Sequence, residues 1–148
     1  MTIIELIDKA TTEALKAGDR DRVTVLRGLK SDIKYAQIDN KGDFDDAATI
    51  AVLSSAAKKR RDSIEQFSAA GRQDLADKET RELAIITEFL PEQLSEDKLR
   101  QIVDDAIAEV SATSAKDMGA IMKVVMPKIK GQADGKMVNK LAMEILAK

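Results

Sequence analysis

Residues 116–136, KDMGAIMKVVMPKIKGQADGK, carry the signals that decide the fold of this chain. A helical segment is followed by a glycine stop at Gly131 and by Asp134, which is placed to cap the next helix. Apolar residues recur at helical spacing along the first segment. They are Met118, Ile121, Met122, Val125 and Ile129. The stretch therefore predicts two helices joined by a short turn, with lysines crowded at the junction.

The same helical periodicity runs through the rest of the chain, and no alternating strand pattern appears. We expect four helices at about residues 2–16, 20–38, 45–69 and 73–89. Asp45 or Asp46 is the expected cap of the third. Pro91 forces Leu90 out of helical geometry and sets a boundary. Ser95, Ser114 and Asp134 are the expected caps of three further helices. The predicted fold class is all-α, with an N-terminal four-helix domain over residues 1–90 and a C-terminal three-helix domain over 91–148.

The composition limits the chemistry that the chain can perform. Its 148 residues are 44% hydrophobic and 34% charged, and they include no Cys and no His. Thiolate chemistry is excluded, and so are the usual general base and the commonest metal ligand. We expect no catalytic residue, no cofactor and no metal site. No apolar run reaches membrane-span length and no secretory signal appears, so we expect no membrane partner and a cytoplasmic location.

Positive charge concentrates in the last quarter of an acidic chain. Residues 91–111 carry two basic and six acidic side chains, and residues 112–148 carry seven basic and three acidic ones. Lysines of this quarter are candidates for contact with a nucleic acid backbone. They are Lys123, Lys128, Lys130, Lys136 and Lys140. The alternative is that these lysines belong to ordinary solvated helix faces.

Two other helices could form a second basic surface. Its candidate residues are Arg27, Lys30 and Lys34 on one helix and Lys58, Lys59 and Arg61 on the next. The alternative is again a solvated face, because Asp32, Asp62 and Glu65 lie nearby in sequence and would neutralise it.

Arg60 breaks the apolar stripe of its helix, and Glu79 and Glu82 break that of the following helix. Arg60 lies eleven residues before Gly71 and Glu82 eleven after it. Equal rise per residue puts these two side chains at similar height in a helical hairpin. An unpaired charge in an apolar stripe is costly, so we predict that Arg60 pairs with Glu79, Glu82 or both. The alternative is a functional site built on the two carboxylates.

Two features of the 116–136 stretch allow more than one interpretation. Met118, Met122 and Met126 step by four and predict a core stripe, with an adaptable binding groove as the alternative. The turn at 131–136 is glycine-rich, but it lacks the spacing of a phosphate-binding loop. Asp134 would also repel an anion there. Lys136 and Lys140 are better placed to meet a phosphate backbone.

Several segments, in order along the chain, carry a family resemblance. They include LRGLKS at 26–31, KKRRDSIEQF at 58–67, AGRQDLA at 70–76, FLP at 89–91 and the stretch 116–136. The chain resembles the GatB/YqeY family. It is similar both to its stand-alone YqeY-like members and to the C-terminal tail region of the GatB subunit of glutamine-dependent aminoacyl-tRNA amidotransferase. Gln132 departs from the basic residue expected there.

The resemblance implies a helical fold, a tRNA neighbourhood and the class of carbon–nitrogen ligases with glutamine as amide donor. The implied role of the tail is to hold tRNA while chemistry occurs on other domains. Since this chain shows no recognisable nucleophile or ATP site, we expect a non-catalytic tRNA-binding accessory module. A synthetase or an amidotransferase subunit is the expected protein partner. The alternatives are a protein-interaction module without RNA contact and an independent amide-transfer enzyme.

Overall fold

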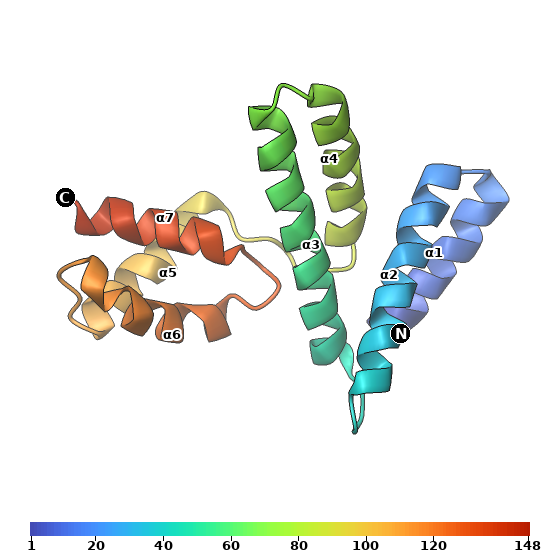
Figure 1. Cartoon of the computed structure of the whole chain (residues 1–148). Coiled ribbons are helices and arrows are strands. Elements are labelled where there is room, and N and C mark those ends of the chain that lie inside the picture. Colours follow the sequence, from blue (N-terminus) through green and yellow to red (C-terminus); the bar gives the residue numbers. More distant parts are fainter. The chain divides into compact units, whose positions relative to one another are not determined.

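The computed structural model describes all 148 residues, and its regular elements are all helical (Figure 1). The first four helices are α1 (Ile3–Ala17), α2 (Arg20–Asp39), α3 (Asp46–Ala69) and α4 (Gln73–Thr87). The others are α5 (Glu96–Glu109), the short 3-10 helix η1 (Ala115–Asp117), α6 (Met118–Lys128) and α7 (Gly135–Leu146). The predicted all-α fold class is therefore confirmed. The chain divides into two compact units, Met1–Leu90 and Pro91–Lys148.

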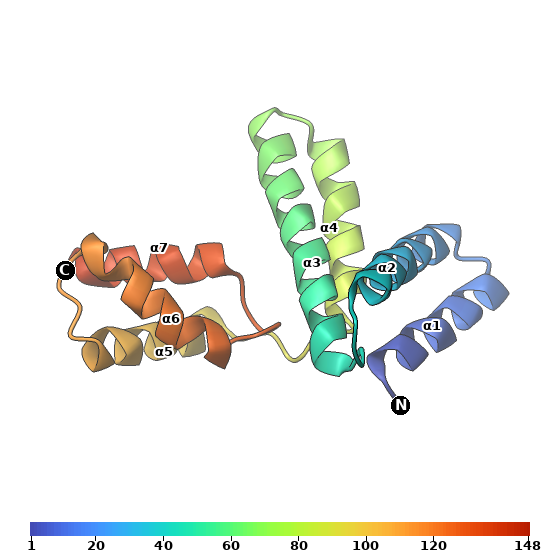
Figure 2. The same cartoon turned by 60° about the horizontal axis from the view of Figure 1, so that its bottom comes forward.

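The N-terminal unit consists of two helical hairpins. In Figures 1 and 2, α1 lies beside α2 and α3 lies beside α4, each pair antiparallel. Helix α2 contacts both α3 and α4, which joins the hairpins. The core of this unit is aliphatic, as the scarcity of aromatic residues requires. Its largest fully buried side chains are Ile7, Leu26, Leu29, Leu53 and Ile86.

Short polar residues and glycines set the helix ends in the N-terminal unit. Gly18 and Gly71 adopt left-handed backbone conformations, with φ of 71° and 74°, and end α1 and α3. Asp45 caps α3 by accepting a hydrogen bond from the Ala48 N–H at 2.9 Å. Asp46, the other expected cap, instead accepts a hydrogen bond from the Ile3 N–H at 3.0 Å. This bond ties the start of α1 to the start of α3.

The C-terminal unit packs α5, α6 and α7 around a separate aliphatic core. Its fully buried members include Leu99, Val103, Ile121, Val125, Val138 and Leu141. Ser95 caps α5 as predicted, by accepting a hydrogen bond from the Lys98 N–H. The predicted capping box of Ser114 and Asp117 is present, but it starts η1 rather than α6.

The methionines of α6 form the predicted core stripe only in part, because Met118 and Met122 pack against the core and Met126 does not. Met118 and Met122 are half-buried, and Met126 is 39% exposed. The buried face of α6 centres on Val125, and Met126, one residue on, lies about 100° round the helix from that centre. Ile121, Val125 and Ile129 fill that face instead. The ends of Met122 and Met126 lie against Gly135 at the start of α7.

Candidate functional site

The five candidate lysines of the C-terminal unit are all exposed. Lys123 and Lys128 lie on α6, Lys130 lies just after it, and Lys136 and Lys140 lie one turn apart on α7. Lys128 Nζ is 3.8 Å from Glu109 Oε2, and both side chains are more than half exposed. Solvent screens such a pair, so it neutralises Lys128 only weakly.

Helix α6 is distinguished by the absence of acidic side chains. Lys116 lies in η1 beside Asp117, Lys123 lies on α6 and Lys130 lies two residues after its end, so the three are seven residues apart in sequence. All three are exposed, and they form no ion pair in the structure. Between them, Gly119 and Ala120 are exposed small residues that leave the helix surface open. We name Lys116, Lys123 and Lys130 the α6 lysine row; Lys116 is the member that the sequence prediction did not include.

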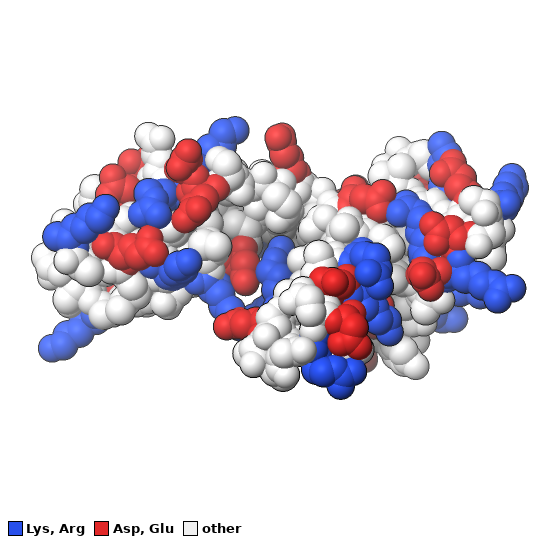
Figure 3. Space-filling view, turned by 90° about the horizontal axis from the view of Figure 1, so that it is seen from above, with Lys and Arg blue, Asp and Glu red and all other residues white.

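The opposite signs of charge mix elsewhere in this unit. Over residues 91–148 the basic and acidic side chains number nine each, so the unit is neutral as a whole. On the side shown in Figure 3, Lys and Arg lie among Asp and Glu. Arg100, for example, lies 3.1 Å from Glu144 and 3.5 Å from Glu96. The basic side chains of this unit lie mostly in residues 112–148, where they outnumber acidic ones by seven to three.

The turn between α6 and α7 is a packed corner rather than an anion site. The Leu94 N–H donates to the Gln132 carbonyl at 2.9 Å, and the Gln93 side-chain amide donates to the Gly131 carbonyl at 2.6 Å. The Gln132 amide donates to the Glu92 carbonyl at 3.3 Å. Asp134 caps α7 as predicted. Gln132 thus holds the turn to the segment before α5, a role that needs no positive charge.

The second set of cations lies on two helices that contact each other, α2 and α3. Lys30 forms an ion pair with Asp8 of α1 at 2.8 Å, and Lys34 lines a pocket between α1 and α2. Arg27 is exposed on α2, one turn before Lys30. Lys58 and Lys59 are exposed on α3, and Arg61 there is half-buried.

Arg60 lies between the two carboxylates that break the stripe of α4. Its Nε is 3.7 Å from Glu79 Oε2 and 3.6 Å from Glu82 Oε2. The Arg60 side chain is 24% exposed and each glutamate side chain 20%. These distances are too long for hydrogen bonds, and the buried Nε has no hydrogen-bond partner. The cluster is therefore held by charge attraction across the α3–α4 hairpin.

Burial raises the pKa of Glu79 above its ordinary value, and the nearby negative charge of Glu82 raises it further. The positive charge of Arg60 opposes this shift without overcoming it. A carboxyl with a raised pKa beside a second carboxyl is one arrangement used for acid–base chemistry. Here an ion pair across a hairpin explains the presence of the two carboxylates structurally.

The chain offers no cluster of three or more side chains suited to hold a metal ion. None of its helices combines the length and the apolar character that crossing a membrane requires.

Comparison with known proteins identifies a family match over almost the whole chain. A family model described as "Yqey-like protein" matches residues 4–146.

Fungal proteins are among the similar sequences. An uncharacterized protein of Schizosaccharomyces pombe is 36% identical over 90 residues, which is 61% of this chain and 73% of that protein. The Lachancea thermotolerans protein named "Altered inheritance of mitochondria protein 41, mitochondrial" is 39% identical over 57% of this chain and 46% of its own length. The protein of the same name from Pyrenophora tritici-repentis is 26% identical over 90% of this chain and 75% of its own length. Similarity thus spans less than half of the Lachancea thermotolerans relative but three quarters of the Pyrenophora tritici-repentis one.

Proposed function

Because this chain belongs to the YqeY-like protein family, we propose that it is a non-catalytic accessory module that binds the phosphate backbone of tRNA. The observation that supports this role is the α6 lysine row, three exposed cations that form no ion pair in the structure. Lysine acts on phosphates as a point charge and carries no base readout. Binding through this row would therefore tolerate many RNA sequences.

The remaining candidate lysines extend the proposed site. Lys136 and Lys140 start α7, and Lys128 stands at the end of α6. The turn that joins these helices is fixed by hydrogen bonds to residues 92–94, so the lysines on its two sides are held in a set arrangement. Because the backbone that carries these lysines is already ordered, binding to a rigid RNA backbone would cost little further ordering of that part of the chain.

The family resemblance implies a link to the class of carbon–nitrogen ligases. The residue types present in this chain favour a non-catalytic role beside such an enzyme. The chain has no thiol and no imidazole to act as nucleophile or base. A glutaminase assay on the pure chain tests the independent-enzyme hypothesis. We expect no ammonia release above background; turnover proportional to protein concentration would reverse that expectation.

The tRNA proposal is tested by charge reversal. Fluorescence anisotropy with bulk tRNA at low salt compares wild type with Lys123→Glu/Lys130→Glu and with Lys136→Glu/Lys140→Glu. Lys9→Glu/Lys41→Glu, two exposed positions in the N-terminal unit, is the matched control. We expect the first variant to lose at least about tenfold in affinity, since it replaces two phosphate contacts by repulsion. Equal affinity of the first variant and the control would exclude the α6 lysine row.

A second candidate function is a protein-interaction module, and exposed apolar residues on α2 favour it. Tyr35 is 71% exposed and Ile38 is 70% exposed, about one turn apart. Aromatic side chains are enriched where proteins meet. A synthetase or an amidotransferase subunit is the partner that the family context supplies. Pull-down from lysate with and without ribonuclease separates the two functions, because only RNA-mediated partners are lost on digestion.

The proposed compartment is the cytoplasm. The mitochondrial names of several relatives make the mitochondrion the alternative. Cell fractionation with an antibody against this chain distinguishes the two.

A further inference from the structure

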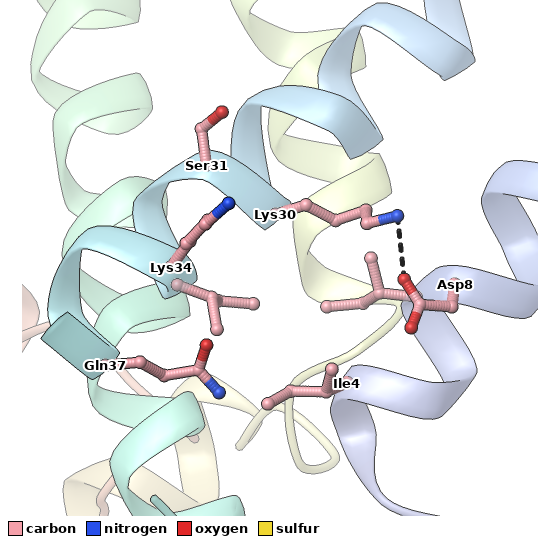
Figure 4. A pocket seen from close by; sticks show the side chains of 8 residues that line it. Ile4, Asp8, Lys30, Ser31, Lys34 and Gln37 are labelled. Carbon is pink, nitrogen blue, oxygen red and sulfur yellow. Dashed lines mark ion pairs between the residues drawn. The ribbon is translucent and has the colours of Figure 1, made fainter.

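A pocket of about 420 Å³ lies between α1 and α2 in the N-terminal unit. Its volume falls within the range of about 300–1,000 Å³ that is usual for small-molecule sites. The lining residues come from both helices, as Figure 4 shows. They include Ile4, Asp8, Lys30, Ser31, Lys34 and Gln37.

The inner wall of the pocket is aliphatic. Ile7 is fully buried and Ile33 is 3% exposed, and the half-buried Ile4 completes the wall. Branched side chains of this kind are stiff and cannot easily turn to fill the space. Because Ile7 and Ile33 lie almost wholly beneath the surface, Ile4 offers most of the aliphatic contact to a hydrocarbon body that enters from solvent.

The start of α1 is held in place, so the pocket is formed without a ligand. The Thr2 side chain accepts a hydrogen bond from the Glu5 N–H, and Glu5 accepts one from the Thr2 N–H. The bond from the Ile3 N–H to Asp46 adds an anchor to α3. Binding to a pocket whose walls are already ordered costs less free energy than binding to one that must first open.

Polar groups line the rim of the pocket. Lys30 reaches across to Asp8 and pairs with it at 2.8 Å, as the dashed line in Figure 4 marks. Both side chains are about half exposed, so solvent screens the pair and Lys30 can exchange partners. Lys34 forms no ion pair, and neither the Ser31 hydroxyl nor the Gln37 amide forms a hydrogen bond.

We propose that this pocket binds a small anion with an aliphatic body. Lys34, Ser31 and Gln37 supply three unused donors for the anionic head, and the isoleucine wall takes the hydrocarbon. Two cations against one carboxylate give the rim a net positive charge, which favours an anion over a neutral or cationic ligand. A carboxylate and a phosphate monoester share the required acceptor chemistry.

The pocket site is independent of the proposed RNA contact. Its residues belong to the N-terminal unit, and the α6 lysine row belongs to the C-terminal unit. Reversing the α6 lysines leaves the pocket untouched, so failure of one proposal does not decide the other.

The test is an amide-resolved NMR titration of the whole chain with four probes that share an eight-carbon chain. The probes are octanoate, octyl phosphate, octanol and octylammonium, used below their micellar concentrations. We expect one or both anions to shift amide signals at residues 4–8 and 30–37. Lys34→Gln should weaken anion binding about tenfold, because it removes a charge-assisted contact. Lys16→Gln, an exposed change on α1 outside the pocket, is the matched control.

Each outcome of the titration either supports or overturns the proposed pocket site. Anion binding that falls in Lys34→Gln and weakens with added salt supports the site, and the better of the two anions identifies its head group. Equal binding of octanol and octanoate would overturn the proposal, since charge would then play no part. Lack of anion binding at millimolar concentration, or binding unchanged in Lys34→Gln, would overturn it as well.

Discussion

Replacing Arg60 tests the charge cluster of the α3–α4 hairpin. In Arg60→Met the cation is lost, and Glu79 and Glu82 remain on the same side of α4 without the cation that pairs with both. Methionine keeps much of the apolar stem of arginine, so the change isolates the charge. The free energy of unfolding of the N-terminal unit should fall.

The size of the loss follows from burial. Exposed ion pairs contribute about 0–1 kcal/mol, and removing one partner of a fully buried pair costs about 3–5 kcal/mol. The Arg60 and glutamate side chains are 24% and 20% exposed, closer to the buried limit. Because Arg60 Nε makes no hydrogen bond, the expected loss of unfolding free energy is smaller than for a fully hydrogen-bonded buried pair. We expect a loss of about 2 kcal/mol.

A double-mutant cycle gives the sharper result. Glu82→Gln removes one of two carboxylates and leaves Arg60 a partner in Glu79. In Arg60→Met/Glu82→Gln the repulsion between the carboxylates is gone, so the combined loss should be smaller than the sum of the single losses. We expect a coupling of about 1 kcal/mol or more. Lys59→Met, an exposed change on the same helix, should stay within about 0.5 kcal/mol of wild type.

Urea unfolding followed by circular dichroism gives the total stability. Because the chain has two compact units, bulk ellipticity mixes their transitions. Hydrogen exchange resolved to peptides of α3, α4 and α7 assigns the loss to the N-terminal unit. An Arg60→Met protein as stable as Lys59→Met, or strictly additive losses in the cycle, would refute the argument.

Four further substitutions test other features. Burial and Glu82 raise the pKa of Glu79 above its ordinary value of 4.5. The protonated Glu79 therefore stabilises the folded state at pH values below 4.5, and this stabilisation is lost as the pH rises through the raised pKa. Glu79→Gln should therefore gain stability relative to wild type between pH 4 and pH 7 in thermal unfolding, and a pH-independent difference would contradict this. Gly71→Ala should cost about 1 kcal/mol because φ there is 74°. Gly28→Ala, with nothing within 4 Å of the added carbon, should gain about 0.5–1 kcal/mol in the same urea assay; a gain at both glycines would refute the backbone argument. The N–H groups of Thr113 and Ser114 lower the pKa of Asp117, so Asp117→Asn should destabilise the C-terminal unit at pH 7, and the difference from wild type should shrink as pH falls below 3.8; unchanged exchange of α6 amides at pH 7 would contradict this.

Local sequence signals predicted most of the fold. Capping by Asp45, Ser95 and Asp134 depends on the residue itself and its nearest neighbours, so a single sequence contains it. The pairing of Arg60 needed one more step, the equal rise of two helices from the turn at Gly71. The structure has Arg60 within 3.6 Å of Glu82.

Features that depend on packing between helices were outside the reach of the sequence. Met126 was placed in the core because its spacing follows Met118 and Met122, yet α5 and α7 pack on the side of α6 that carries Val125 and leave Met126 exposed. The pocket beside Lys34 depends on how α1 and α2 separate at one end, which no local pattern specifies. The sequence showed an excess of basic residues over residues 112–148 but did not single out the α6 lysine row, because a charge count does not say which side chains share a surface.

The salt dependence of tRNA affinity tests the central claim most directly. Each phosphate neutralised on duplex-like RNA should contribute about −0.9 to the slope of log affinity against log salt. The α6 lysine row predicts a wild-type slope of about −2 or steeper, and a slope shallower by about 1.8 for Lys123→Gln/Lys130→Gln. A wild-type slope near zero, or one that the double substitution leaves unchanged, would contradict RNA binding through this row.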